Sequence, residues 1–146
     1  MSSPSTVTAA DPRTIEHLAA ALNRCFETLE APPDLFTDDV FCDLLPPFWR
    51  FQLEGREAFV EQLRAIANGA ISSRVVRVLP TSLGFVLEHE ETQSGPPSET
   101  ARRVWICGVD DGRISELTCY CNGGWDDELR ARHAAEAPMV RTEAGR

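Results

Sequence analysis

The chain has 146 residues and a formal net charge of -9, and 42% of its residues are hydrophobic. These values predict one globular domain and exclude a disordered chain, and an acidic chain without a basic stripe disfavours a nucleic-acid partner. No apolar run reaches the roughly 20 residues that cross a bilayer, and the N-terminus lacks a basic stretch followed by an apolar one, so we do not expect a secretory signal. We therefore expect a soluble, cytoplasmic protein with no membrane partner.

An amphipathic helix is predicted near the start of the chain. Residues 1–12 are rich in Ser, Thr, Ala and Pro and predict a flexible arm. Asp11 followed by Pro12 is typical of a helix start, because Asp accepts hydrogen bonds from free N–H groups and Pro at the first position has none to satisfy. Apolar residues then recur every three or four positions as far as Leu29, which predicts a helix that ends before the following prolines.

A short hairpin and a second helix are predicted next. Residues 40–45 have the character of a strand and end at two prolines, and residues 49–53 are expected to return beside them. Gly55 breaks the chain. The apolar residues after it recur at four- and three-residue steps, which predicts a second amphipathic helix ending near Asn68-Gly69.

The rest of the chain is predicted to be mostly strands. They are expected at residues 74–79, 85–91, 102–109 and 114–121, with a tight hairpin turn at Asp110-Asp111-Gly112. A helix over residues 126–137 ends a single domain of residues 13–137, and residues 138–146 form a flexible tail. Helices segregated from a run of strands predict an α+β fold, in which helices on one side of a curved sheet leave a pocket.

Three local segments carry a resemblance to a known family. They are FTDDVFCD at residues 36–43, GREA at residues 55–58, and DGRI followed by CYCN within residues 111–122. In this order and spacing they resemble the NTF2-like superfamily, in particular its SnoaL-like branch, a group that also includes ketosteroid isomerases and limonene epoxide hydrolases. The resemblance covers about residues 14–125.

The resemblance has implications for fold and partners. It implies a strongly curved antiparallel sheet, wrapped by three N-terminal helices around an apolar pocket. It also implies a homodimer formed through the outer face of the sheet, and a small-molecule substrate handled without a cofactor.

Asp43 is the first candidate catalytic residue. It follows Phe41 at strand spacing and is flanked by Leu44 and Leu45, surroundings that desolvate a carboxylate and favour proton transfer near neutral pH. In the ketosteroid isomerases that the chain resembles, an Asp near this point shuttles the proton. The alternative is an Asp that caps the turn before Pro46.

His89 is the second candidate. Phe85, Leu87 and His89 alternate with Glu88 and Glu90, so the imidazole is expected on the apolar side of its strand. There it can act as a general acid or base, or donate a hydrogen bond to a substrate oxygen. Because this face lines the cavity in the families that the chain resembles, Phe85 and Leu87 are expected to contact substrate. The alternative is a hydrogen-bonded core histidine.

Further residues complete the predicted site. Trp49, Trp105 and Tyr120 are expected to shape the cavity. Asn122 stands where relatives often carry Asp, and its amide is expected to orient a carbonyl group or a water. Epoxide hydrolases of the group use an Asp–Arg–Asp set around a water. Arg103 is a candidate for its Arg, although an Arg beside a turn is more often solvated.

The five cysteines predict buried thiols rather than disulfides, because their number is odd and no secretory signal precedes them. Cys119 and Cys121 share one face of a strand, opposite Tyr120, and the spacing leaves open which set faces the pocket. A zinc site usually needs a different spacing and two more ligands. We expect no metal, and a thiol or metal site at this pair is a weaker alternative.

Two functions from different classes follow from these residues. The first is a cofactor-free acid–base enzyme (a cyclase, isomerase, dehydratase or epoxide-opening enzyme) acting on a mostly apolar, polyketide- or terpene-like metabolite. Asp43 would move the proton and His89 would assist, so D43N and H89A are expected to lose turnover. The alternative is a non-catalytic ligand-binding or dimerisation module, whose pocket side chains such as Trp49 and Trp105 would fill. A cavity into which Asp43 and His89 both open would support the enzyme.

Overall fold

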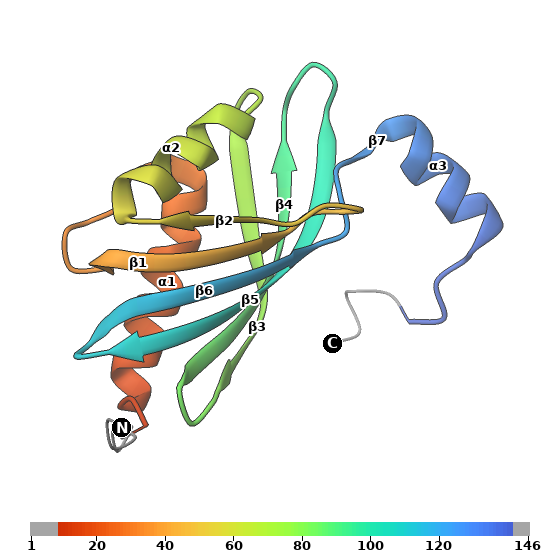
Figure 1. Cartoon of the computed structure of the whole chain (residues 1–146). Coiled ribbons are helices and arrows are strands. Elements are labelled where there is room, and N and C mark those ends of the chain that lie inside the picture. The colour runs from red at the N-terminus through yellow and green to blue at the C-terminus, as the bar shows by residue number, and fades with distance from the viewer. Residues whose placement is uncertain (1–8, 142–146) are drawn as a thin grey trace.

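Two helices precede a long run of strands, and a third helix follows it (Figure 1). The computed structural model describes residues 9–141. Its helices are α1 (Pro12–Thr28), α2 (Arg56–Ile66) and α3 (Asp127–Glu136), and its strands are β1 (Phe36–Leu45), β2 (Phe51–Glu54), β3 (Ile71–Pro80), β4 (Gly84–Gln93), β5 (Glu99–Asp110), β6 (Arg113–Cys121) and β7 (Trp125–Asp126). The predicted α+β class is confirmed.

The strands form one sheet in the order β2-β1-β6-β5-β4-β3, with β7 paired to β5. Neighbours are antiparallel except β1 and β6, which run parallel with Cys42 opposite Leu117 and Leu44 opposite Cys119. The sheet is therefore mixed, whereas a wholly antiparallel sheet was expected. The exception arises because β1 and β6, far apart in the sequence, enter the sheet side by side.

Local signals at both ends explain the position of α1. The Asp11 carboxylate accepts a hydrogen bond from the N–H of Arg13 at 2.8 Å, with Pro12 in the first turn, as predicted. At the other end Leu29 adopts a left-handed conformation, and its N–H bonds to the carbonyl of Cys25. The apolar stripe of the helix is buried against the sheet, because α1 packs along β3 and β4.

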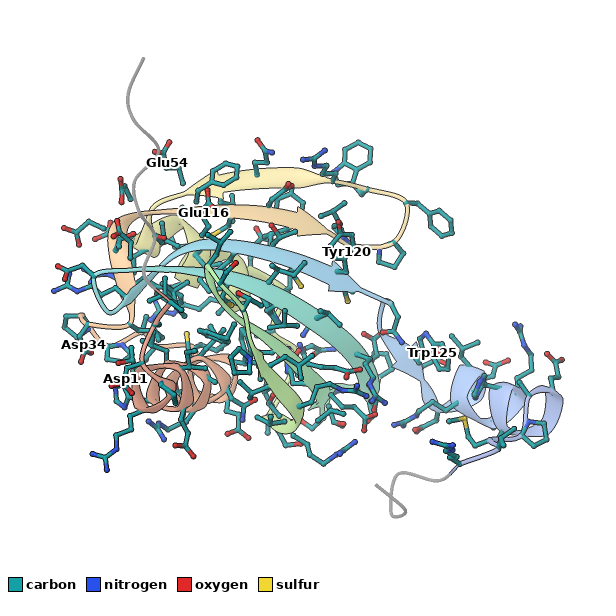
Figure 2. All side chains as sticks on the ribbon, turned by 90° about the horizontal axis from the view of Figure 1, so that it is seen from below. Asp11, Asp34, Glu54, Glu116, Tyr120 and Trp125 are labelled. Carbon is teal, nitrogen blue, oxygen red and sulfur yellow. The ribbon has the colours of Figure 1, made fainter. Side chains whose placement is uncertain are left out.

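The helices differ from the expected three at the N-terminus. Two of them, α1 and α2, lie on one side of the sheet (Figure 1). The segment between α1 and β1 makes only a turn at residues 33–35, closed by a hydrogen bond from the Leu35 N–H to the Pro32 carbonyl. Helix α3 stands away from the sheet beyond Trp125, and none of its residues is buried (Figure 2).

The alternation of side chains along the strands places the core between the helices and the sheet. The core side chains that point inward from the strands include Val40, Cys42, Phe85, Leu87, Trp105, Cys107, Leu117 and Cys119. They pack against the buried stripe of α1 and against Phe59 of α2. Strand residues of the opposite parity face the outer side of the sheet, except across a bulge such as that in β6, where Ile114 and Leu117 are both buried. This parity decides which predicted residues reach the interior.

Some sequence-based expectations fall outside these elements. Residues 1–8 of the predicted arm and 142–146 of the predicted tail lie outside the described residues, and the division into arm, domain and tail stays a prediction. Among the described residues, no helix has both the length and the apolar sequence that a membrane span requires.

Candidate ligand-binding pocket

An apolar pocket of about 210 Å³ lies between α2 and the inner face of β1, β5 and β6. Helix α2 contributes Phe59, Gln62, Leu63 and Ile66; the β1–β2 hairpin contributes Leu44, Leu45, Pro46 and Phe51; and the sheet contributes Arg103, Trp105, Cys119 and Cys121. Most of these side chains are hydrocarbon, aromatic or thiol groups. The pocket therefore suits an apolar ligand, with Arg103 as the charged group at its surface.

A second, polar cavity of about 280 Å³ adjoins the first. The two cavities share Ile66 and Arg103 as lining residues. The remaining lining residues of the polar cavity are Asn68, Glu91, Gln93, Glu99, Ala101 and Gly124. Apolar and polar surfaces thus meet at one guanidinium group.

Arg103 of β5 forms an ion pair with Glu91 of β4. The two side chains are only 14% and 6% exposed, so each needs the other to offset the loss of hydration. The Gln93 side chain adds a hydrogen bond to the same Glu91 oxygen at 3.2 Å. Burial is the largest single influence and opposes the charge of Arg103, but the Glu91 carboxylate and, to a smaller extent, Cys121 and Cys119 together raise the pKa of the guanidinium. The Arg103–Glu91 ion pair therefore lies buried beside the apolar pocket.

The thiols of β6 face the pocket. The sequence had not decided between the thiol face and the Tyr120 face of this strand. Cys119 and Cys121 line the cavity, whereas Tyr120 points to the outer side of β6 and is 52% exposed (Figure 2). Burial raises the pKa of the Cys119 thiol well above its usual value. The Cys121 sulfur accepts a hydrogen bond from the Gly123 N–H at 3.3 Å. All five cysteines are free thiols.

His89 is fully buried in the core beside the pocket, and both of its ring nitrogens are hydrogen-bonded. The indole N–H of Trp105 donates to Nε2 at 2.8 Å, and Nδ1 lies 2.8 Å from the Ser73 hydroxyl. The ring also stacks on Phe26 at a centroid distance of 4.5 Å. This is the hydrogen-bonded core histidine that the sequence offered as the alternative.

These contacts fix the state of the imidazole. Because Nε2 accepts from Trp105, the ring proton is on Nδ1, which donates to the Ser73 oxygen. The Ser73 hydroxyl then donates to the Asn23 side-chain oxygen, 2.6 Å away. Burial, with a smaller contribution from the Arg103 charge, lowers the pKa of His89 to about 3. A neutral imidazole without a free nitrogen cannot exchange protons with a ligand in this conformation.

Asp43 lies on the other face of the sheet. It shares that face with Phe41, as its spacing predicted, but this is the outer face, because Cys42 and Leu44 are the buried neighbours. Arg50 of the β1–β2 hairpin donates two hydrogen bonds to its carboxylate, at 2.9 and 2.6 Å. Hydrogen bonding to Arg50 lowers the pKa of Asp43. The expectation that Asp43 and His89 open into one cavity is wrong, and a catalytic role for Asp43 stays a prediction.

The other predicted contact residues are spread over the molecule. Trp105 lines the pocket, whereas Phe85 and Leu87 are fully buried core residues. Trp49 is 72% exposed beyond the end of β1. Asn122 is exposed, and its side-chain oxygen accepts a hydrogen bond from the Arg102 N–H at 2.7 Å, which extends the β5–β6 pairing.

Sequence reasoning missed Glu91 and the α2 side of the pocket. Glu91 follows Phe85, Leu87 and His89 at the same two-residue step, so the alternation that placed His89 inside also places Glu91 there. The missing signal was its partner, because Arg103 on the next strand had been considered as a candidate site residue with Asp43, or as a solvated Arg beside a turn, and not as a partner of Glu91. The two oppositely charged residues meet only after β4 and β5 pair.

Two larger hollows, of about 540 and 580 Å³, follow the exposed side of α2 and share Arg56, Glu57 and Glu61. They are open grooves with charged walls, so the more enclosed apolar pocket is the better candidate site. Within residues 9–141, no cluster of three or more His, Cys, Asp or Glu side chains is arranged to hold a metal ion.

Solved structures match this chain in fold. An NTF-2 like protein of unknown function from Burkholderia xenovorans gives a TM-score of 0.63 at 18% identity, over 88% of this chain and 97% of its own. A candidate ketosteroid isomerase from Kribbella flavida gives 0.64 at 17%, over 90% and 93%. An LEH-like epoxide hydrolase from M. tuberculosis gives 0.62 at 16%, over 87% and 98%. No protein-family model and no curated protein matches the sequence.

These likenesses establish the architecture. The chain has the NTF2-like fold, and the resemblance drawn from the three sequence segments is confirmed at this level. The fold is shared by proteins with different activities, so the function has to be argued from the pocket itself.

Proposed function

We propose that this protein binds a small, mostly apolar molecule in the pocket between α2 and the sheet. The observation that carries the proposal is an apolar pocket lined by Arg103, whose buried ion-pair partner Glu91 lines the adjoining polar cavity. Trp105 forms part of its wall and Trp49 lies outside it, so neither fills the space as a purely structural module would require. Buried charges next to apolar surface are costly and are typical of functional sites.

We further propose that the protein acts on this molecule by acid–base chemistry. The Glu91 carboxylate would take up a proton from a ligand carbon. The Arg103 guanidinium would stabilise the negative charge that develops on a ligand oxygen. Among the described residues Arg103 hydrogen-bonds to Glu91 through one nitrogen, so its other N–H groups can serve a ligand. The fold neighbours described as an isomerase and an epoxide hydrolase support this class of reaction.

Binding can be tested with 2-phenylethanol as a neutral probe. Trp105 lies in the pocket wall, so a W49F/W125F variant reports binding through the fluorescence of Trp105 alone. Leu63→Trp in that background fills the pocket and is expected to weaken binding at least tenfold, detected by calorimetry. Leu83→Trp, at an exposed turn residue, is the matched control. Equal affinity for both variants would place the probe elsewhere and contradict the proposed site.

Acid–base chemistry can be tested with phenylacetone in deuterated water. The protein is expected to accelerate the exchange of the hydrogens next to the ketone, followed by NMR, and E91Q is expected to reduce the rate to background. E116Q removes an exposed carboxylate from the outer face and should leave the rate unchanged. Loss of exchange in D43N with retention in E91Q would restore the first assignment. Probe binding without exchange would favour the non-catalytic module.

We also propose that two copies pair through the outer face of β1, β5 and β6. Phe41, Ile106 and Tyr120 are exposed there, one on each strand, and are 37%, 46% and 52% accessible. The charged pairs Asp43–Arg50 and Glu88–Arg102 lie beside this apolar patch on the same face. An apolar centre with a charged rim is the usual composition of a protein interface. A cytoplasmic location and a role in secondary metabolism stay predictions.

A further inference from the structure

The two neighbouring cavities differ in chemistry and share two lining residues, Ile66 and Arg103. One is lined mainly by hydrocarbon and aromatic groups, and the other by carboxylates and amides. Because Ile66 and Arg103 line both, we infer that one molecule occupies the apolar pocket with its body and the polar cavity with its head group. Such a site selects a ligand with an apolar body and a polar head.

The polar cavity offers mainly hydrogen-bond acceptors. One side-chain N–H of Gln93 donates to the Glu91 carboxylate at 3.2 Å, and one of Asn68 donates to the Pro96 carbonyl at 3.2 Å. The Gln93 oxygen accepts from the Asn68 backbone N–H at 2.6 Å. The carboxylates of Glu91 and Glu99 remain as strong acceptors, so the cavity suits a head group that donates hydrogen bonds.

The charge of the polar cavity is also negative. Glu91 and Glu99 carry two negative charges, and Arg103 supplies one positive charge that its ion pair with Glu91 largely neutralises. Glu99 makes no ion pair within the described part of the chain. Its carboxylate lies along Gly124, where a Cβ atom would come within 2.3 Å of Oε2. The glycine therefore leaves room for this carboxylate at the cavity surface.

We propose that the ligand is an amphipathic amine, with its apolar body in the pocket and its ammonium group beside Glu99 in the polar cavity. This inference rests on the proposed function, because it names the head group of the molecule that the apolar pocket binds. The ammonium group supplies hydrogen-bond donors and a positive charge for the Glu99 carboxylate, because Arg103, the cation of this cavity, is paired with Glu91. The net charge of -9 on the whole chain also raises the local concentration of cations.

Three probes of similar size test the head group: 2-phenylethylamine, 2-phenylethanol and phenylacetate, each titrated into the full chain by calorimetry at pH 7. We expect the amine to bind about fivefold tighter than the alcohol, the range of a partly exposed ion pair, and phenylacetate to bind most weakly. Glu99→Gln should bring the amine to the affinity of the alcohol, and should change binding of the alcohol by less than about twofold.

A matched control separates the effect of the Glu99 carboxylate on amine binding from the effect of the chain's net charge. Glu116→Gln removes the same charge from the outer face of β6 and is expected to leave the preference for the amine intact. Equal binding of amine and alcohol, or the same loss in both variants, would overturn the amine head group while leaving the proposed apolar site in place. Failure of all three probes to bind would overturn the proposed site together with this inference.

Discussion

The inner face of β4 carries two ionisable side chains, His89 and Glu91, and the neighbours of each decide what it can do. His89 meets Trp105 and Ser73, which occupy both of its nitrogens. Glu91 meets Arg103 at the border of two cavities. The same strand parity therefore produces a fixed structural group at one position and an ion-paired carboxylate that lines a cavity at the next.

The buried imidazole should make stability depend on pH. Its pKa is about 3 in the folded protein and 6.5 for an unperturbed imidazole. Between these values the unfolded chain binds a proton that the folded protein excludes, so the free energy of unfolding falls as pH drops, by at most about 1.4 kcal/mol per pH unit from this group. Urea denaturation of the wild type and H89Q at pH 7, 6, 5 and 4 measures this dependence.

Comparing H89Q with the wild type separates the contribution of His89 to the pH dependence of stability from that of the carboxylates, which titrate in both proteins. At pH 7 we expect H89Q to be less stable by about 1–3 kcal/mol, the cost of disrupting buried hydrogen bonds, and the difference from wild type should narrow toward pH 4. H17Q removes an exposed imidazole of α1 and should show no such narrowing. A constant difference between wild type and H89Q would mean that His89 gains its proton without unfolding.

At the residue scale, the sequence predicted which side chains share a face of a strand, but not whether that face is buried or exposed. Alternation correctly grouped Asp43 with Phe41, and His89 with Phe85 and Leu87. It could not tell that the face of Asp43 is the outer one, since Phe41 is itself an exposed aromatic residue. Only the pairing of β1 with its neighbours, and the helices packed on one side, assign each face to core or solvent.

The β5–β6 hairpin shows how a turn can be specified by two residues. Asp111 and Gly112 join Asp110 to Arg113 and both have positive φ, 50° and 75°, the conformation that the Asp-Gly pair predicted. Gly112→Ala places a side chain in open space, so its cost is purely conformational. We expect a loss of about 1–2 kcal/mol in the free energy of unfolding, measured by urea denaturation at pH 7.

The opposite substitution, a residue with a side chain replaced by glycine, can be made at the neighbouring Asp111. D111G puts glycine where an ordinary residue already has positive φ, and should change stability by less than the G112A substitution does. A similar loss in both variants would show that the turn depends on the Asp111 side chain rather than on backbone conformation. Probe binding should be unaffected in either case, because the turn contributes no residue to the pocket.

Elements with local signals were predictable, and the pairing of distant ones was not. The start of α1 at Asp11-Pro12 and the hairpin at Asp111-Gly112 were both located from neighbouring residues. The parallel pairing of β1 with β6 has no local signature, because it depends on where the whole intervening chain places the two strands. The pocket inherits this difficulty, since its walls come from β1, α2, β5 and β6.

On the scale of the molecule, the two faces of the sheet differ in what covers them. The inner face encloses the core and the pocket, and helices cover it. The outer face of β1, β5 and β6 carries the exposed apolar patch of Phe41, Ile106 and Tyr120, on the side of the sheet opposite α1 and α2 (Figure 1). An exposed apolar patch of this kind is typical of an interaction surface, and the proposed dimer would cover it with a second copy.

Dimerisation can be tested by placing a charge in the centre of the patch. Ile106→Glu adds a negative charge to each copy at a point where a two-fold interface brings the copies together, so desolvation and repulsion should separate them. Analytical ultracentrifugation is expected to show a dimer for the wild type and a monomer for I106E. L83E, which alters an exposed leucine in the β3–β4 turn, should remain dimeric. A monomeric wild type, or a dimer that survives I106E, would rule out this face as the interface.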